Sequence, residues 1–233
     1  MIALAAMRAI FFDAVGTLIH PDPPAALAYA RIGQRFGSRL GEAQVVQRFA
    51  AAFAHEEELD RAGNLRTSAE RERRRWRTIV ARVLDDVTDA EACFRALYEH
   101  FAQPHAWRCD PAAAFLLQKL NDAGYHLGLA SNYDERLRSV VAGLASLQRI
   151  QHLVISAEVG WRKPAPEFYA ALCRAVDLPA ATILHLGDDR SNDYDGARAA
   201  GLQALLLDPK RRHVDLGDNR IDTLAQLVDR SSV

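Results

Sequence analysis

Short apolar runs that alternate with helical segments are the feature that most constrains how this chain can fold. Five such runs are expected to be strands: Ala9–Phe12, Tyr125–Ala130, His152–Ser156, Thr182–Leu186 and Leu202–Leu207. Gly124 and Gly201 lie where helices between these strands should end. Asp110 and Pro111 are expected to cap and open a helix over Ala112–Asn121. Apolar strands alternating with helices are typical of a parallel sheet covered on both faces. We therefore predict an α/β fold with a doubly wound parallel sheet.

A long segment without strand-like runs separates the first expected strand from the second. Its composition and periodicity favour four helices, over Ala25–Phe36, Glu42–Arg61, Thr67–Val87 and Thr88–Phe101. Thr67 with Glu70, and Thr88 with Glu91, fit capping boxes at two of the helix starts. We therefore expect an all-helical domain, residues 21–105, inserted into an α/β core made of residues 1–20 and 106–233. Both pieces have ordinary domain sizes.

Composition excludes several other classes of protein. The 233 residues are 49% hydrophobic and 25% charged, with a net charge of −1, which argues against disorder and against a nucleic-acid or membrane binder. The apolar segment before Asp13 is interrupted by Arg8 and is too short to span a bilayer. Either Met1 or Met7 could be the natural start. The three cysteines are far apart, which favours reduced thiols and a cytoplasmic protein.

Polar residues follow the expected strands at points where a parallel sheet would gather them. Asp13 and the Gly16-Thr17 turn follow the first strand, and Ser131-Asn132 follows the second. Ligands bind beyond the carboxyl ends of such strands, and hydroxyl and amide groups there suit an anionic oxygen. Each residue also has an ordinary structural explanation. Asp13 could form an Asx turn and Ser131 could cap a helix.

A cluster of acids follows the expected strand Thr182–Leu186, and a lysine precedes it in the chain. Asp188 and Asp193 lie in the segment Gly187–Asp193, which leads into a helix expected over Asn192–Ala200. Crowded carboxylates repel one another by about 4 kcal/mol at roughly 4 Å, and a hard divalent cation such as Mg²⁺ would relieve this repulsion. A polar helix start is the alternative. Lys163, before Pro164, could serve the same site or lie in solvent.

Taken together in chain order, these motifs resemble those of the haloacid dehalogenase (HAD) superfamily. The most specific pieces are Phe12-Asp13-x-x-Gly16-Thr17-Leu18 and Gly187-Asp188 through Asp193, with Gly196-Ala197-x-x-Ala200-Gly201. The helical insertion resembles the cap of the subgroup that includes 2-haloacid dehalogenases and phosphoglycolate-type phosphatases. The resemblance covers nearly the whole chain and implies a Rossmann-like core with a hydrolase site. We call the insertion, residues 21–105, the cap.

The resemblance also implies roles for the motif residues. Asp13 would be the nucleophile that forms an aspartyl-phosphate, Ser131 would bind the transferring group, and Lys163 would neutralise charge. Gly16, Thr17 and Asn132 would contact the substrate. Mg²⁺ would be held by Asp13, Asp188, Asp193 and the backbone carbonyl of Val15. The implied substrate is a small phosphorylated metabolite.

Position 15 departs from the superfamily pattern. Its phosphatases typically carry there a second aspartate that protonates the leaving oxygen, and this chain has Val15, which has no proton to give. Three explanations remain open: a phosphatase with weakened acid/base catalysis or another acid, a 2-haloacid dehalogenase, or a catalytically silent binding protein. His20 is the nearest alternative acid, although His20-Pro21-Asp22-Pro23 also reads as the turn into the cap. Dehalogenases depart from the Gly-Asp form that Gly187-Asp188 keeps, which favours a metal-dependent phosphoryl site.

The cap concentrates positive charge in one helical region around Trp76. The arginines concerned are Arg66, Arg71, Arg73, Arg74, Arg75, Arg77 and Arg82. Neighbours on a helix differ by about 100°, so they cannot all face one way. A solvated face paired with Glu70 and Glu72 is one explanation, and a contact from Arg74 or Arg77 to the substrate is the other. The three tryptophans are expected to pack rather than stack on a ligand. Substrate identity, oligomeric state and the open or closed state of the cap are left open.

Overall fold

The protein is described by a computed structural model covering residues 4–230, so Met1 lies outside the described residues. A six-stranded parallel sheet forms the core, in the order β5-β4-β1-β6-β7-β8. The strands are β1 (Ala9–Phe12), β4 (His126–Ser131), β5 (His152–Ile155), β6 (Ile183–Gly187), β7 (Gln203–Leu207) and β8 (Arg220–Ile221). Five of them are the predicted strands, shifted by at most one residue at either end. The short edge strand β8 was not predicted.

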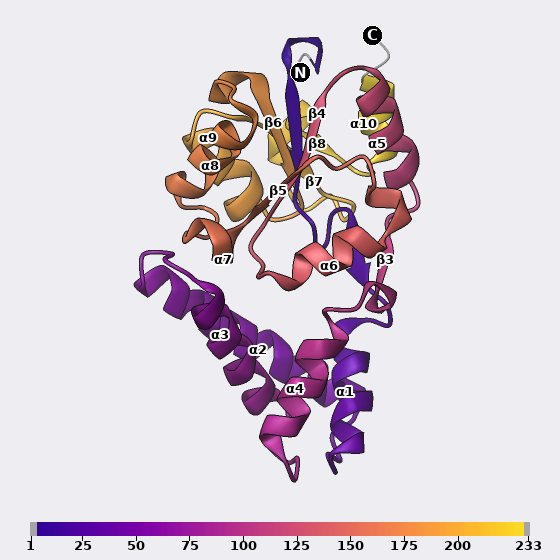
Figure 1. The fold of residues 1–233 in the computed structure, drawn as a ribbon, viewed down its shortest axis with the longest axis vertical. Coiled ribbons are helices and arrows are strands. Elements are labelled where there is room, and N and C mark those ends of the chain that lie inside the picture. The colour runs from indigo at the N-terminus through magenta and orange to yellow at the C-terminus, as the bar shows by residue number, and fades with distance from the viewer. Residues whose placement is uncertain (1–3, 231–233) are drawn as a thin grey trace.

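Helices cover both faces of this sheet, which confirms the doubly wound α/β fold (Figure 1). The core helices are α5 (Ala113–Asp122), α6 (Arg136–Gly143), α7 (Ser156–Val159), α8 (Pro166–Val176), α9 (Gly196–Ala199) and α10 (Ala225–Arg230). Alternate residues of β1 face opposite sides. Ile10 and Phe12 pack with the helices α5 and α10, whereas Ala9 and Phe11 pack with α8 and α9. The sheet is therefore buried on both faces, which explains why its strands are apolar throughout.

Four long helices lie together on one side of the sheet, beyond its carboxyl edge (Figure 1). They are α1 (Ala25–Arg35), α2 (Glu42–Ala62), α3 (Ala69–Val83) and α4 (Ala90–His100). They share an apolar core of their own, centred on side chains such as Tyr29, Ile79 and Phe94. Two short strands, β2 (Ile19–Pro21) and β3 (Trp107–Cys109), pair antiparallel where the chain enters and leaves the four helices. No helix of residues 4–230 is long and apolar enough to cross a membrane.

Several helix ends differ from the sequence prediction. Helix α3 begins after Ser68, whose hydroxyl accepts from the Arg71 backbone N–H, and α4 begins after Asp89. The hydroxyl of Thr67 donates instead to Glu72, at 2.7 Å, so it is not available as a cap. Helix α5 begins later than predicted, and Asp110 accepts from the Ala112 N–H without capping the helix.

The helix predicted over Asn192–Ala200 is split into two pieces. A π-helical turn over Arg190–Asp195 precedes the short α9. Such turns are uncommon and are frequent at functional sites. Gly124 and Gly201 both have positive φ just after a helix, as predicted.

Candidate active site

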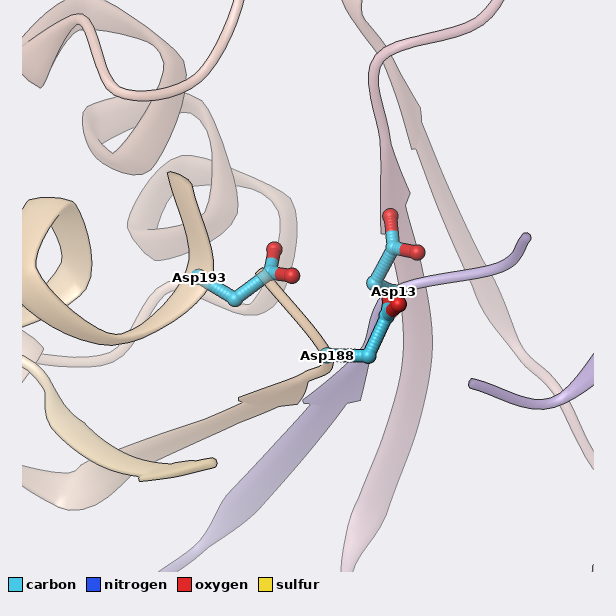
Figure 2. A group of neighbouring side chains, drawn as sticks. All are labelled: Asp13, Asp188 and Asp193. Atoms are coloured by element: carbon cyan, nitrogen blue, oxygen red, sulfur yellow. The ribbon is translucent and has the colours of Figure 1, made fainter. Parts of the chain in front are cut away.

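The carboxyl ends of three neighbouring strands bring the predicted site residues together. Asp13 follows β1, Ser131 ends β4, and Asp188 follows β6. These strands are adjacent in the order β4-β1-β6, so residues more than a hundred positions apart meet at one edge. Ser131 is buried at this edge. Figure 2 shows Asp13, which follows β1, beside Asp188 and Asp193, which follow β6.

Lys163 lies at the centre of this group and is almost completely buried. Its Nζ atom donates to Asp13 Oδ1 at 2.7 Å, to Asp193 Oδ1 at 2.6 Å and to the Ala130 carbonyl at 2.8 Å. These acceptors match the three N–H donors of an ammonium group. Burial alone would lower the pKa of Lys163, but attraction by Asp13 and Asp193 outweighs it and raises that pKa. The lysine therefore stays charged beside the predicted nucleophile.

The side chains of Asn132 and Thr17 fix the residues around them. Asn132 accepts from the Lys163 backbone N–H at 2.7 Å and donates to the Lys163 carbonyl at 3.0 Å. Thr17, which is fully buried, donates to Asp188 Oδ1 at 3.3 Å. Gly16 has φ +96°, and a Cβ atom there would lie 2.6 Å from Asp188 Oδ2. Thus Gly16 and Thr17 meet Asp188, and Asn132 anchors Lys163. Of these three, Asn132 also lines the cavity described below.

The three aspartates form the carboxylate cluster that a cation site requires. One oxygen from each of Asp13, Asp188 and Asp193 lies within 4.8 Å of the others. Burial and repulsion from the neighbouring acids raise the pKa of Asp13 to about 6, despite the attraction of Lys163. Burial, followed by repulsion from Asp193, raises the pKa of Asp188 to about 6. Burial is therefore the main cause of both shifts, and the crowded negative charge adds to it.

Asp193 differs from the other two acids because hydrogen bonds occupy both of its oxygens. Oδ1 faces Lys163 Nζ and His185 Nε2, the latter at 3.1 Å, and Oδ2 accepts from the Asp189 N–H at 3.0 Å. Burial opposes its ionisation, but Lys163 and His185 outweigh burial and lower the pKa of Asp193. The geometry therefore makes Asp193 a partner that orients Lys163.

His185 is the buried polar neighbour that sequence reasoning missed. It lies in the middle of β6, and its side chain is fully buried. The run Thr182–Leu186 predicts an apolar strand. A single histidine within it does not indicate that it has a hydrogen-bond partner eight residues later. The π-helical turn supplies that partner, because it turns Asp193 back toward the strand. The Asp189 carboxylate begins the turn by accepting from the Asn192 N–H at 2.7 Å.

A cavity of about 650 Å³ separates the carboxyl edge of the sheet from the four cap helices. Asp13, Val15, Ser131 and Lys163 line it on the core side. His20 is not among its lining residues. It lies half-buried in β2 opposite Arg108, and burial together with that arginine lowers its pKa. The structure thus favours the interpretation of His20 as part of the connection to the cap.

Buried charges join the cap to the core beside the cavity. Arg162 ion-pairs with Glu72 and approaches Asp60 and Glu57 at 3.4 Å each. Arg75 pairs with Glu57 at 2.6 Å and with Asp60 at 3.0 Å. We call these five residues the cap–core ion cluster. Backbone bonds lie next to it, from Thr67 N–H to the Gly160 carbonyl and from Arg162 N–H to the Leu65 carbonyl.

The other cap arginines are distributed as a solvated face predicts. Arg74 pairs with Glu70 and Arg77 with Glu91, all with largely exposed side chains, and neither arginine lines the cavity. Arg75 and Arg71 are exceptions. Arg75 is buried and lines the cavity, and Arg71, which is 23% exposed, pairs with the buried carboxylates of Glu56 and Asp60. The prediction that Arg74 or Arg77 reaches the substrate finds no support in this geometry.

Comparison with known proteins identifies the family. The sequence model of the haloacid dehalogenase-like hydrolases matches residues 7–201. The chain therefore belongs to the haloacid dehalogenase-like hydrolase family. A human relative, haloacid dehalogenase-like hydrolase domain-containing protein 3, is 26% identical over 95% of this chain and 92% of its own length. A ribulose-1,5-bisphosphate 5-phosphatase from Halopiger xanaduensis is 27% identical over 51% of this chain and 55% of its own length.

Solved structures share the fold over nearly the full length. The HAD-hydrolase YfnB from Bacillus subtilis, bound to magnesium, has a TM-score of 0.76 at 17% identity, covering 97% of this chain and 99% of that one. An L-2-haloacid dehalogenase also has a TM-score of 0.76, at 22% identity, with the same coverage. These likenesses confirm the Rossmann-like HAD core.

Proposed function

We propose that this hydrolase is a magnesium-dependent phosphatase that acts on a small phosphorylated molecule through an aspartyl-phosphate. The observation that carries the proposal is the contact of Asp13 with the buried ammonium of Lys163, beside a second carboxylate from Asp188. A carboxylate next to a fixed positive charge at the base of a cavity suits attack on an anionic phosphoryl group. The relative that is a sugar-bisphosphate phosphatase supports this direction.

The donor set fits a hard cation. Asp13 and Asp188 present carboxylate oxygens with no nitrogen or sulfur ligand in the cluster. Their raised pKa values reflect burial first and repulsion from neighbouring acids second, and a bound cation would offset both. In this proposal Asp13, Asp188 and the Val15 carbonyl hold Mg²⁺, with Asp193 close by. A bound Mg²⁺ would neutralise charge on the phosphoryl oxygens.

The residues of the chain then have distinct tasks. One oxygen of Asp13 attacks phosphorus, while Lys163 balances the negative charge and Ser131 donates to a phosphoryl oxygen. Water later hydrolyses the aspartyl-phosphate and releases Asp13. The cap, residues 21–105 in this proposal, covers the cavity and excludes bulk water. Val15 gives no proton to the leaving oxygen, a loss worth on the order of 10²–10⁴ in rate.

Two other functions remain as alternatives. A 2-haloacid dehalogenase also needs no acid at position 15, because halide leaves unprotonated, and an L-2-haloacid dehalogenase shares the fold. Asp188 argues for the phosphatase, since its carboxylate completes a cation site beside Asp13. A catalytically silent binding protein would keep the same carboxylates and Lys163 but would not turn over a substrate.

One panel of assays separates the three functions. The purified protein is incubated with phosphate monoesters and with 2-haloacids, each with Mg²⁺ and with a chelator, and phosphate and halide release are measured. We expect phosphate release only with Mg²⁺, and a phosphoryl adduct on Asp13 by mass spectrometry. The isosteric Asp13→Asn variant should abolish both.

The other outcomes each contradict the proposal. Halide release that is unchanged by the chelator would identify a dehalogenase. Binding of Mg²⁺ and of a phosphate analogue without any turnover would identify a silent binder. Turnover retained in Asp13→Asn would remove the nucleophile from the mechanism.

The cellular setting is also part of the proposal. Cys93, Cys109 and Cys173 are all free thiols. Free thiols are typical of a reducing compartment, so we infer that the protein works in the cytoplasm. The cavity and the charge balance suit a small-molecule substrate and not a nucleic acid.

A further inference from the structure

The cavity between cap and core is polar at one end and aromatic at the other. Asp13, Lys163 and Asp188 lie at the polar end, and most of the remaining surface is apolar. Rings from all four cap helices contribute to the far wall: Tyr29, Phe49, Phe53, Trp76, Phe94 and Tyr98. An apolar pocket with a few convergent polar groups is the usual form of a small-molecule site. The wall faces the part of a substrate that would leave.

The wall is continuous and already ordered. Tyr29 contacts Phe49 edge-on with ring centroids 5.2 Å apart, Phe49 stacks on Phe53 at 6.0 Å, and Phe53 meets Trp76 at 6.4 Å. Offset and edge-on arrangements of this kind are the favourable ones for aromatic rings. A flat aromatic group in the cavity would pack against this row of rings.

The buried cations along the cavity are already neutralised by carboxylates. Arg75 and Arg162 belong to the cap–core ion cluster, and Arg136 makes two hydrogen bonds to the Asp134 carboxylate. Arg61 is 64% exposed and lies 4.0 Å from Glu57, so solvent screens its charge. A second phosphate or a carboxylate on the substrate would therefore need one of these pairs to break. The leaving part of the substrate should accordingly be uncharged, unlike that of a sugar bisphosphate.

Val15 adds an independent restriction from the core side. It is half-buried and lines the cavity next to the nucleophile, where a general acid would be needed for a poor leaving group. A phenol-type hydroxyl such as that of tyrosine has a pKa of about 10, against 15.7 for water. A phenolate can therefore depart without being protonated, whereas an aliphatic alkoxide cannot depart readily.

We propose that the substrates are phosphate monoesters of aromatic hydroxyl compounds, with the ring seated against the aromatic wall and the phenolate leaving unprotonated. This inference rests on the proposed phosphatase function. An Asp13 carboxylate oxygen forms a bond to phosphorus, and the bond from phosphorus to the aryl oxygen breaks, with its electron pair remaining on the phenolate. Water then attacks phosphorus, the bond to Asp13 breaks, and phosphate and one proton are released to solvent.

A series of leaving groups tests the acid-free mechanism. Substituted phenyl phosphates that span a range of phenol pKa, together with propyl phosphate and acetyl phosphate, are compared by kcat/KM in Mg²⁺. We expect phenyl phosphates to exceed propyl phosphate by about 10²–10⁴-fold, the size of the missing acid contribution. We also expect a rate that falls steeply as the phenol pKa rises. Val15→Asp should raise propyl phosphate turnover and flatten that dependence.

A second comparison tests recognition of the ring. Phe53→Leu should raise KM for phenyl phosphate about three- to tenfold, the scale of one lost aromatic contact, and leave KM for acetyl phosphate unchanged. Phe115→Leu is the matched control, because Phe115 is 58% exposed and lies outside the cavity. Acetyl phosphate has a good leaving group without a ring, so it separates the requirement for a good leaving group from the requirement for an aromatic ring.

The outcomes distinguish this inference from the proposed function. Hydrolysis of propyl phosphate as fast as phenyl phosphate, a KM for acetyl phosphate no higher than that for phenyl phosphate, or equal KM changes in Phe53→Leu and Phe115→Leu would each overturn the aromatic substrate class and leave the phosphatase standing. If none of the phosphate esters is hydrolysed, the phosphatase itself fails and the substrate class with it.

Discussion

Arg162 should be one of the most sensitive positions for stability, although it is not in the predicted catalytic set. Its side chain is 3% exposed, and its partner Glu72 is 1% exposed. Removing one member of a buried ion pair costs about 3–5 kcal/mol, because the remaining charge is left without compensation. Glu72 keeps the Thr67 hydroxyl at 2.7 Å and the nearby Arg75. We therefore expect Arg162→Met to cost about 3 kcal/mol, the lower end of that range.

Urea unfolding monitored by circular dichroism measures this loss. The control is Arg138→Met, which removes an ion pair to Glu158 from a side chain that is 54% exposed, and should cost about 1 kcal/mol or less. The double variant Arg162→Met/Glu72→Gln should cost less than the two single changes added together, because it leaves no isolated charge. A loss for Arg162→Met no greater than that for Arg138→Met would refute the reasoning.

Three further predictions concern the site and the ion cluster. Gly16→Ala should weaken Mg²⁺ binding in calorimetry and lower phosphatase activity, since the new Cβ would displace Asp188. Asn132→Ala should lower kcat about 10- to 100-fold, because Lys163 loses both of its backbone anchors. Attraction by Arg162 and Arg75 outweighs burial and lowers the pKa of Glu72 below 4.5. The ionised Glu72 carboxylate therefore contributes its full stabilisation of the folded protein above pH 4.5, and this contribution is lost as the pH falls through the lowered pKa. Glu72→Gln should accordingly flatten the acid limb of the curve of stability against pH.

Matched variants keep these three predictions specific. Gly124 also has positive φ, at +85°, with nothing within 4 Å of a new Cβ, so Gly124→Ala should cost about 1–2 kcal/mol in stability without affecting Mg²⁺. Equal Mg²⁺ affinity in the two alanine variants would contradict the steric argument. Asn121 lies on α5 outside the cavity, and Asn121→Ala should leave kcat unchanged. An unaltered acid limb in Glu72→Gln would show that another group controls it.

Strands and motif residues could be predicted from the sequence because burial on both faces leaves an apolar run that polar turns interrupt. Asp13 and Asp188 were expected at one edge on that basis, and β1 and β6, which they follow, are neighbours in the sheet. The starts of α3 and α4 were each missed by two residues, because several hydroxyl and carboxyl side chains compete to cap these helices. Thr67 is bonded to Glu72 instead, a contact that no local pattern records.

The cap–core ion cluster could not be predicted for a different reason. Charged residues on a helix are normally solvated, so Glu57, Asp60 and Glu72 carried no signal of burial. Their partner Arg162 comes from the core, about ninety positions further along the chain than Glu72. Pairing over such a distance follows from tertiary packing alone. His185 and Asp193 are only eight positions apart, but a turn of rare geometry brings them together, and no sequence pattern records that turn.

The position of β1 in the sheet sets an order of events during protein synthesis. Both neighbours of this central strand are made much later, since Ala9 pairs with His126 and with Ile183. The strand that carries Asp13 leaves the ribosome early and waits without its partners. The four cap helices are contiguous in the chain and can pack as soon as they emerge. Asp13, the proposed nucleophile, is thus made before the other residues of the candidate site, but its surroundings are completed only after β6 and the acids that follow it have been added.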